Sequence, residues 1–136
     1  MKKPVHKTLL VLLIIYGTAS LIHFTHNAAF LADYPNLPAS WTSASVYLAW
    51  VALTAVGVTG WFLMVRGFPV VGLLLLGVYA VLGLDSLGHY IVASMSDHTL
   101  GMNSTILFEV TAAALVLIEV VRQMMYQLRR HLKHGA

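Results

Sequence analysis

The sequence contains no cysteine and few charged residues. None of its 136 residues is Cys, which excludes disulfides, thiolate metal ligands and cysteine nucleophiles. Any bound metal must therefore be held by nitrogen, oxygen or methionine sulfur. Only 10% of the residues are Asp, Glu, Lys or Arg, far below the roughly 25% of a soluble domain. The sequence also lacks internal repeats, a catalytic serine motif and a phosphate-binding loop.

The sequence is instead rich in hydrophobic residues. Hydrophobic residues make up 59% of it, and the mean hydropathy is +0.80. Four apolar stretches, at about 9–30, 45–65, 70–91 and 102–121, each approach the roughly 20 residues that a helix needs to cross a bilayer. We expect a single all-α domain over 1–136, a polytopic membrane protein built as an antiparallel four-helix transmembrane bundle.

The basic residues predict the orientation of this bundle. They precede the first helix, separate the second from the third, or follow the fourth: Lys2, Lys3, Lys7, Arg66, Arg122, Arg129, Arg130 and Lys133. With four crossings these positions share one side, which the positive-inside rule makes cytoplasmic. We therefore expect cytoplasmic N- and C-termini in a bacterial-type inner (cytoplasmic) membrane. Because topology explains the net charge of +3, no nucleic-acid partner is expected. The basic tail at 122–136 is expected to extend the last helix along the anionic lipid surface.

Two pairs of polar residues lie inside the predicted spans. His23 and His26 are three residues apart, and Asp85 and His89 are four apart, so each pair shares one helix face. Ionisable side chains are costly in lipid and usually have a partner or a function.

Helix geometry places these pairs at similar depths. At 1.5 Å per residue, His23 and Asp85 lie roughly 21 to 23 Å from the cytoplasmic end, and Glu109 lies roughly 18 Å from it. His26 and His89 lie one turn further out, with His98 in the loop above. The outer half of the bundle therefore gathers up to four histidines and two carboxylates.

Imidazole and carboxylate ligands suit zinc or iron, and also copper where nitrogen dominates. The pattern predicts a divalent transition-metal site near the extracytoplasmic face, used for metal-dependent chemistry or for metal handling, and leaves open whether the protein is an enzyme. The expected ligands are His23, His26, Asp85 and His89. Glu109 is a fifth ligand, a bridge to a second metal, the catalytic general base, or an acceptor that orients an imidazole. His98, between Met95 and Met102, is a further candidate ligand.

Two other functions stay open. In one, the polar residues only lock the helices together, and the chain is an accessory subunit or a homo-oligomer whose 33–41 loop docks on a membrane-protein partner. In the other, His23 or His26 ligates a haem together with His89 in an electron carrier. The carboxylates at the same level argue against haem, because they favour a hard cation.

Overall fold

Four long helices make up most of the structure. The computed structural model describes residues 5–134, so Lys2 and Lys3 lie outside the described residues. The elements in chain order are α1 (Val5–Ala29), η1 (Leu31–Asp33), α2 (Ser43–Val65), α3 (Pro69–Leu84), η2 (Asp85–Gly88), α4 (His89–Val92), η3 (Met95–Asp97) and α5 (Leu100–His134). Four segments are long and apolar enough to cross a membrane: Lys7–Ala29, Ser43–Val65, Pro69–Val92 and Leu100–Arg130. The expected all-helical fold, with four helices long and apolar enough to span a membrane, is confirmed.

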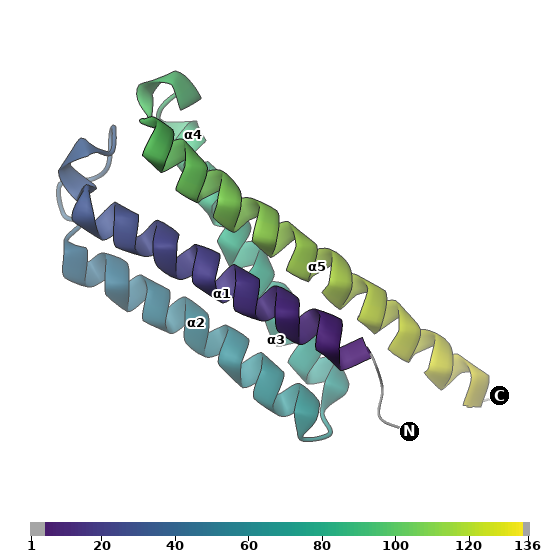
Figure 1. Cartoon of the computed structure of the whole chain (residues 1–136). Coiled ribbons are helices and arrows are strands. Elements are labelled where there is room, and N and C mark those ends of the chain that lie inside the picture. Colours follow the sequence, from purple (N-terminus) through teal and green to yellow (C-terminus); the bar gives the residue numbers. More distant parts are fainter. Residues whose placement is uncertain (1–4, 135–136) are drawn as a thin grey trace.

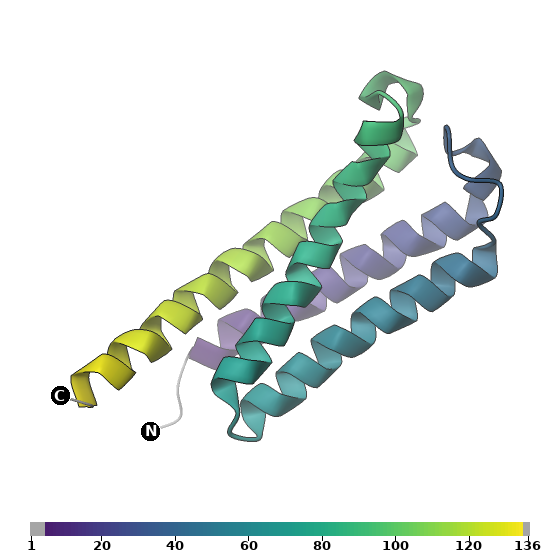
Figure 2. The same ribbon diagram turned by 180° about the vertical axis from the view of Figure 1, so that it is seen from behind.

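Consecutive long helices run in opposite directions (Figure 1). The start of α1, the turn between α2 and α3, and the end of α5 lie together; we call this the terminal end, and the opposite one the loop end. Packing is strongest between α2 and α3, between α3 and α5, and between α1 and α5. From their shared turn, α2 and α3 diverge toward the loop end (Figure 2). The bundle is therefore tightest at the terminal end.

The turn between α2 and α3 has a recognisable helix stop and start. Gly67 has φ +100°, in the left-handed region that glycine enters at no steric cost. The Phe68 amide then donates to the Leu63 carbonyl at 3.0 Å, the hydrogen bond of a Schellman motif. Pro69 begins α3, at a position where its missing N–H is not needed. This short turn holds α2 and α3 side by side.

Close approach of α2 and α3 depends on small residues. A Cβ on Gly72 would lie 2.6 Å from the Gly60 carbonyl oxygen and 2.5 Å from the Met64 amide nitrogen. Further along, a Cβ on Gly57 would lie 2.6 Å from the ring of Tyr79. Beyond this level the two helices diverge (Figure 2).

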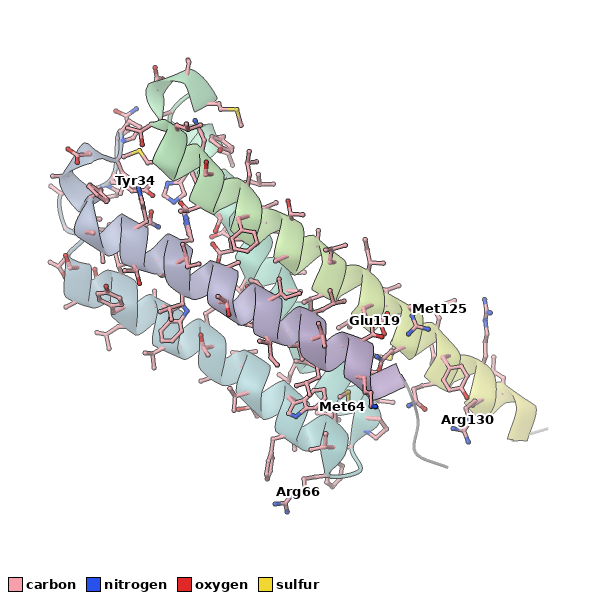
Figure 3. The ribbon with its side chains drawn as sticks, viewed as in Figure 1. Tyr34, Met64, Arg66, Glu119, Met125 and Arg130 are labelled. Carbon is pink, nitrogen blue, oxygen red and sulfur yellow. The ribbon has the colours of Figure 1, made fainter. Side chains whose placement is uncertain are left out.

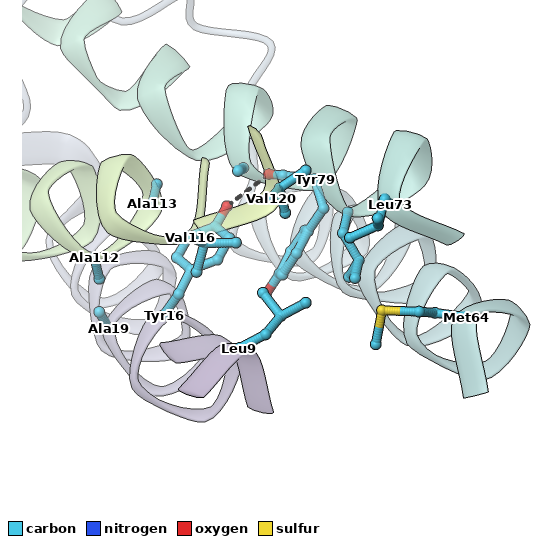
Figure 4. Close-up of a cluster of buried hydrophobic side chains, with 12 residues drawn as sticks. Leu9, Tyr16, Ala19, Met64, Leu73, Tyr79, Ala112, Ala113, Val116 and Val120 are labelled. Atoms are coloured by element: carbon cyan, nitrogen blue, oxygen red, sulfur yellow. Dashed lines mark hydrogen bonds between the residues drawn. The ribbon is translucent and has the colours of Figure 1, made fainter. Parts of the chain in front are cut away.

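Apolar side chains fill the terminal half of the bundle. Leu9, Leu76 and Val116 are fully buried there, and Tyr16 and Tyr79 pack with ring centroids 4.4 Å apart. The Tyr16 hydroxyl donates to the Tyr79 carbonyl at 3.0 Å, drawn as a dashed line in Figure 4. This cluster separates the polar residues of the loop end from those of the terminal end.

Two helix boundaries differ from the predicted apolar spans. The predicted helix at 70–91 leaves α geometry at Asp85–Gly88, where it tightens to a 3-10 turn, so Asp85 and His89 are not joined by regular α-helix. The predicted helix at 102–121 begins at Leu100 and continues to His134. The tail has no Gly or Pro before His134 and follows the direction of α5 (Figure 1), because no residue in it stops the helix.

Candidate functional site

A cavity of about 590 Å³ lies between α1, α2 and the α3–α4 segment, toward the loop end. Most of its lining residues on α2 belong to the half of that helix nearer the loop end, where α2 and α3 diverge (Figure 2). The wall contributed by α2 is apolar and consists of Val46, Ala49, Ala52, Leu53 and Val56. A volume of this size lies within the range of roughly 300–1,000 Å³ that is typical of small-molecule sites.

The loop after α1 closes the cavity at the loop end. Leu31, Leu37 and Trp41 line the cavity from this side. The Asn36 amide donates to the Val92 carbonyl at 2.8 Å, which ties the loop to the end of α4. Asn36 has φ 58°, a left-handed conformation that Asn adopts more readily than most residues. The loop predicted at 33–41 therefore lies over the site.

The α1 wall is polar and hydrogen-bonded. His23 is 1% exposed; its Nε2 lies 3.0 Å from Asn27 Nδ2, and its Nδ1 lies 3.3 Å from Thr105 Oγ1. With this Asn27 orientation, the amide nitrogen can only donate, so Nε2 accepts and the proton resides on Nδ1. Thr105 accepts that proton's hydrogen bond and donates its own to the Met102 carbonyl at 3.0 Å. His23 is held as a neutral imidazole with its Nε2 lone pair inside the bundle.

Glu109 lies behind this wall and is completely buried. Ser86 Oγ donates to Glu109 Oε2 at 2.5 Å, and His23 Nε2 lies 3.7 Å from the same oxygen. Glu109 Oε1 has no hydrogen-bond partner among the described residues. Because Ser86 and His23 both line the cavity, they connect the cavity to the carboxyl group of Glu109.

The 3-10 turn at Asp85–Gly88 shapes the opposite wall. Residues i and i+3 eclipse in 3-10 geometry, which aligns Ser86 with His89. Asp85, Ser86, Gly88 and His89 all line the cavity. Asp85 is exposed, and no ion pair in the described part of the chain includes it. A departure from α geometry thus brings three polar side chains to one wall.

A group of rings extends from this wall toward the loop end. The ring centroids of His23 and His89 lie 5.4 Å apart, those of His89 and His98 6.1 Å apart, and those of Tyr34 and His89 5.1 Å apart. The Tyr34 hydroxyl lies 3.0 Å from His26 Nδ1. Burial raises the pKa of Tyr34 to about 12, so its hydroxyl keeps its proton at neutral pH and can donate it to His26.

His98 has a defined tautomer. Its Nδ1 lies 2.9 Å from the Ser94 carbonyl oxygen, which can only accept, so Nδ1 carries the proton. Within the described residues its buried Nε2 has no hydrogen-bond partner. The Met102 sulfur lies 3.5 Å from the Thr99 amide nitrogen and serves the start of α5. Of the two methionines that flank His98 in the sequence, Met102 therefore has a local structural role at the start of α5.

The structure separates the predicted ligands into smaller sets. His23 and Glu109 face each other, His89 lies beside His23, Asp85 lines the cavity, and His26 is directed to Tyr34. In the part of the chain that the structure describes, no three His, Cys, Asp or Glu side chains are grouped closely enough to hold one metal ion. A site made from His23, His26, Asp85, His89, Glu109 and His98 stays a prediction.

Sequence reasoning missed several side chains of this site. Asn27, Ser86, Thr105 and Tyr34 hold the histidines and Glu109 in place. Asn27 lies one turn after His23, and Ser86 directly follows Asp85, so their positions beside the ionisable residues were a usable signal. Trp41 and Leu37 offered none, because the path of their loop depends on tertiary contacts.

Comparison with protein-family models, with characterised proteins and with solved structures finds no match for this chain.

Proposed function

We propose that this chain is a small-molecule-binding protein of a bacterial-type inner membrane, with cytoplasmic termini and a cavity near the outer face. The described basic residues support the orientation, because Lys7 lies in the first turn of α1 and Arg66 and Arg130 lie at the terminal end (Figure 3). The loops at the other end, 30–42 and 93–99, contain Asp33 and Asp97 but no Lys or Arg. Positive charge marks the cytoplasmic side.

The cavity is the observation that carries this proposal. It is a partly open cleft of about 590 Å³, a volume within the range of small-molecule sites. Its α2 wall is apolar, and polar atoms converge on the opposite side from His23, Asn27, Asp85, Ser86 and His89. A molecule with an apolar body and one polar group matches this division, since convergent polar groups fix the orientation of a ligand. Such a molecule would reach the site from the bilayer.

A photoreactive probe tests the proposal. We choose a trifluoromethyl-phenyl-diazirine that carries a benzyl alcohol, because it is neutral and has an apolar body with one hydroxyl group. Labelling of the purified protein in detergent is expected to saturate with probe concentration at α2 positions that line the cavity. Ala49→Phe fills the cavity and should lower saturable labelling by about tenfold or more, equivalent to about 1.4 kcal/mol of binding.

Ala55→Phe is the matched control for that experiment. Ala55 lies on the same helix and is exposed, but it is not among the residues that line the cavity, so its substitution should leave saturable labelling unchanged. Labelling that rises linearly with probe concentration, equally in both variants, would mean that only bilayer lipid enters the cavity. That result would contradict the proposal and favour the accessory-subunit alternative.

Metal binding is the second candidate, and the facing of His23 and Glu109 favours it. Two acceptor atoms, His23 Nε2 and Glu109 Oε2, lie 3.7 Å apart. A zinc ion forms bonds of about 2.0–2.1 Å to nitrogen and about 2.0–2.2 Å to carboxylate oxygen, so one ion can bind both atoms at this separation. Further ligands would have to come from a rearranged neighbour such as His89, from water or from a bound molecule.

Haem fits this packing less well. Ligation by His23 and His89 requires a macrocycle between the two rings. Their centroids lie 5.4 Å apart in an edge-on arrangement, and this contact leaves no gap for a flat cofactor.

A further inference from the structure

The acidic residues of this chain are distributed unevenly. The sequence contains five Asp and Glu residues. Asp33 and Asp97 lie in the loops. Glu119, near the terminal end, pairs with Arg122, whose Nε and Nη2 lie 2.7 and 2.6 Å from its two oxygens. Asp85 lines the cavity and Glu109 lies buried behind its wall, and neither is paired with Lys or Arg among the described residues.

The cavity therefore has negative charge without a matching positive charge. None of the described residues that line it is Lys or Arg, and His23 is held as a neutral imidazole by Asn27 and Thr105. The described Lys and Arg residues belong to the terminal end, beyond the buried apolar cluster around Leu76 and Val116. Of the described residues that line the cavity, only His23 and His89 can take up a positive charge, so when both imidazoles are neutral the counter-charge for Asp85 comes from outside the bundle.

The surroundings of Asp85 are of low polarity, so a counter-charge stabilises its carboxylate more than it would in water. Coulomb interactions strengthen several-fold as the effective dielectric constant falls from that of water. A carboxylate near an apolar wall is stabilised by a cation and destabilised by an anion. The walls around Asp85 are apolar on the α2 side, where Leu53 and Val56 face the cavity. The carboxylate of Asp85 would attract a bound cation and repel a bound anion of the same shape.

Aromatic rings add a second preference for positive charge. Phe24 and Trp41 both line the cavity, and Trp41 retains 43% exposure at the loop that closes it. The faces of such rings attract cations by about 0.5–2 kcal/mol, with Trp the strongest. Carboxylate and aromatic groups therefore favour the same sign of charge.

From this charge distribution we propose that the cavity selects a lipophilic organic cation, such as a substituted ammonium or phosphonium compound, with its charge near Asp85 and its hydrocarbon between α2 and α3. This inference rests on the proposed binding function and adds the chemical class of the ligand. Metal ions in the second candidate would exploit the same negative charge, but they would not need the apolar wall.

Two probes of nearly equal shape and opposite charge test the inference. Tetraphenylphosphonium and tetraphenylborate are each added as competitors to the neutral diazirine probe on the purified full chain. In the wild type, tetraphenylphosphonium should halve the saturable labelling at a concentration at least about tenfold lower than tetraphenylborate, a difference of about 1.4 kcal/mol. Asp85→Asn should remove most of this preference. Comparing the two proteins cancels any difference in how the probes partition into detergent.

Two variants separate the charge of Asp85 from its structural effects. Asp85→Glu keeps the charge and should keep the preference for the cation. Asp33→Asn removes an equal charge from the loop, where Asp33 does not line the cavity, and should also leave the preference intact.

The possible failures are distinguishable. Saturable labelling that both ions displace equally well, or that neither displaces, would overturn the selection of cations and leave the binding function standing. Absence of saturable labelling would overturn both.

Discussion

At the residue scale, the site consists of ionisable groups held by neutral polar neighbours. His23 is fixed by Asn27 and Thr105, and Glu109 is fixed by Ser86. Buried polar groups without such partners cost about 1–3 kcal/mol each, which explains why small hydroxyl and amide side chains surround the histidine and the carboxyl group. Glu109 Oε1 has no hydrogen-bond partner among the described residues, so the carboxyl group retains capacity for a proton, a metal ion or a ligand. His23 Nε2, in contrast, would have to give up its hydrogen bond from Asn27 to bind a metal ion.

The metal candidate makes a prediction at this scale. Protein purified without a metal-binding affinity tag should carry about one zinc or iron ion per chain, measured by elemental analysis, if His23 and Glu109 are ligands. His23→Ala and Glu109→Gln should each lose this ion, because each removes one of the two facing atoms. His26→Ala is the control three residues along the same helix. Its side chain is directed to Tyr34, so its loss should leave the metal content unchanged. Equal metal content in wild type and in His23→Ala would remove this candidate.

At the element scale, the cavity exists because α2 and α3 are in close contact only near the turn that joins them. Gly60 and Gly72 allow α2 and α3 to touch through backbone atoms near their turn, while the other ends diverge (Figure 2). The 3-10 turn after α3 then directs Asp85, Ser86 and His89 toward the opening. The contact between Gly60 and Gly72 near the terminal end and the 3-10 turn at Asp85–Gly88 near the loop end together define the site.

Gly72→Ala tests the closed end. The added Cβ would meet the Met64 amide nitrogen at 2.5 Å, and backbone atoms cannot move aside as a flexible side chain can. We expect the free energy of unfolding to fall by about 1–3 kcal/mol, the usual cost of overpacking. Unfolding by SDS in mixed micelles, followed by tryptophan fluorescence, measures this change.

Gly77→Ala is the control in the same helix. There the nearest atom, Val120 Cγ1, lies 3.7 Å from the added Cβ, an ordinary contact. This variant should be neutral or gain up to about 1 kcal/mol from helix propensity. Equal destabilisation by both substitutions would mean that the contact between α2 and α3 is not what the glycine at position 72 protects.

At the scale of the whole molecule, the two ends of the bundle differ in charge and packing. The terminal end has the basic residues and a filled apolar interior. The loop end has the cavity, the carboxylates Asp85 and Glu109, and the ring group around His89. Because the apolar cluster around Tyr16 and Tyr79 lies between the two ends (Figure 4), the polar residues of the cavity do not continue to the terminal end.

The proposed orientation follows from this asymmetry and can be measured. The chain has no cysteine, so Ser40→Cys and Phe68→Cys each introduce a unique thiol, one in the loop over the cavity and one in the turn between α2 and α3. A membrane-impermeant maleimide added to intact cells should label Ser40→Cys and should label Phe68→Cys only after the membrane is permeabilised. The reverse pattern would place the cavity at the cytoplasmic face and contradict the proposed topology.

Much of the fold could be predicted because its signals are local. Runs of apolar residues predict the spans, and Gly67 and Pro69 mark the turn between α2 and α3. The apolar span was predicted to end near Val121 and the basic tail to extend the helix beyond it, and α5 does continue to His134, because loss of hydropathy does not stop a helix whose following residues favour it. The break at Asp85 was missed, because no Pro lies near it and a single Gly inside an apolar run does not by itself signal a change of helix type. Gly83 lies just before it, but this glycine makes room for the ring of Tyr16.

The candidate site was predicted in part, as residues but not as geometry. Depth arithmetic placed His23, Asp85 and Glu109 near one level and His89 one turn further out, and the structure brings the side chains of His23, Glu109 and His89 close together. The depth arithmetic could not give the rotation of each helix about its axis. This rotation turns His26 toward Tyr34 and leaves Asp85 on the cavity wall.

The sequence by itself determined the number of spans, their apolar character and the uneven distribution of charge, because each of these depends on composition along short segments. Only the tertiary structure decided that a cavity lies between α2 and α3, that Ser86 and His23 connect it to Glu109, and that Trp41 lies at its closing loop. These features depend on which helices touch and how far they diverge. That is set by the backbone contact between Gly60 and Gly72 and by the rotation of each helix about its axis, which no pattern within a single helix specifies.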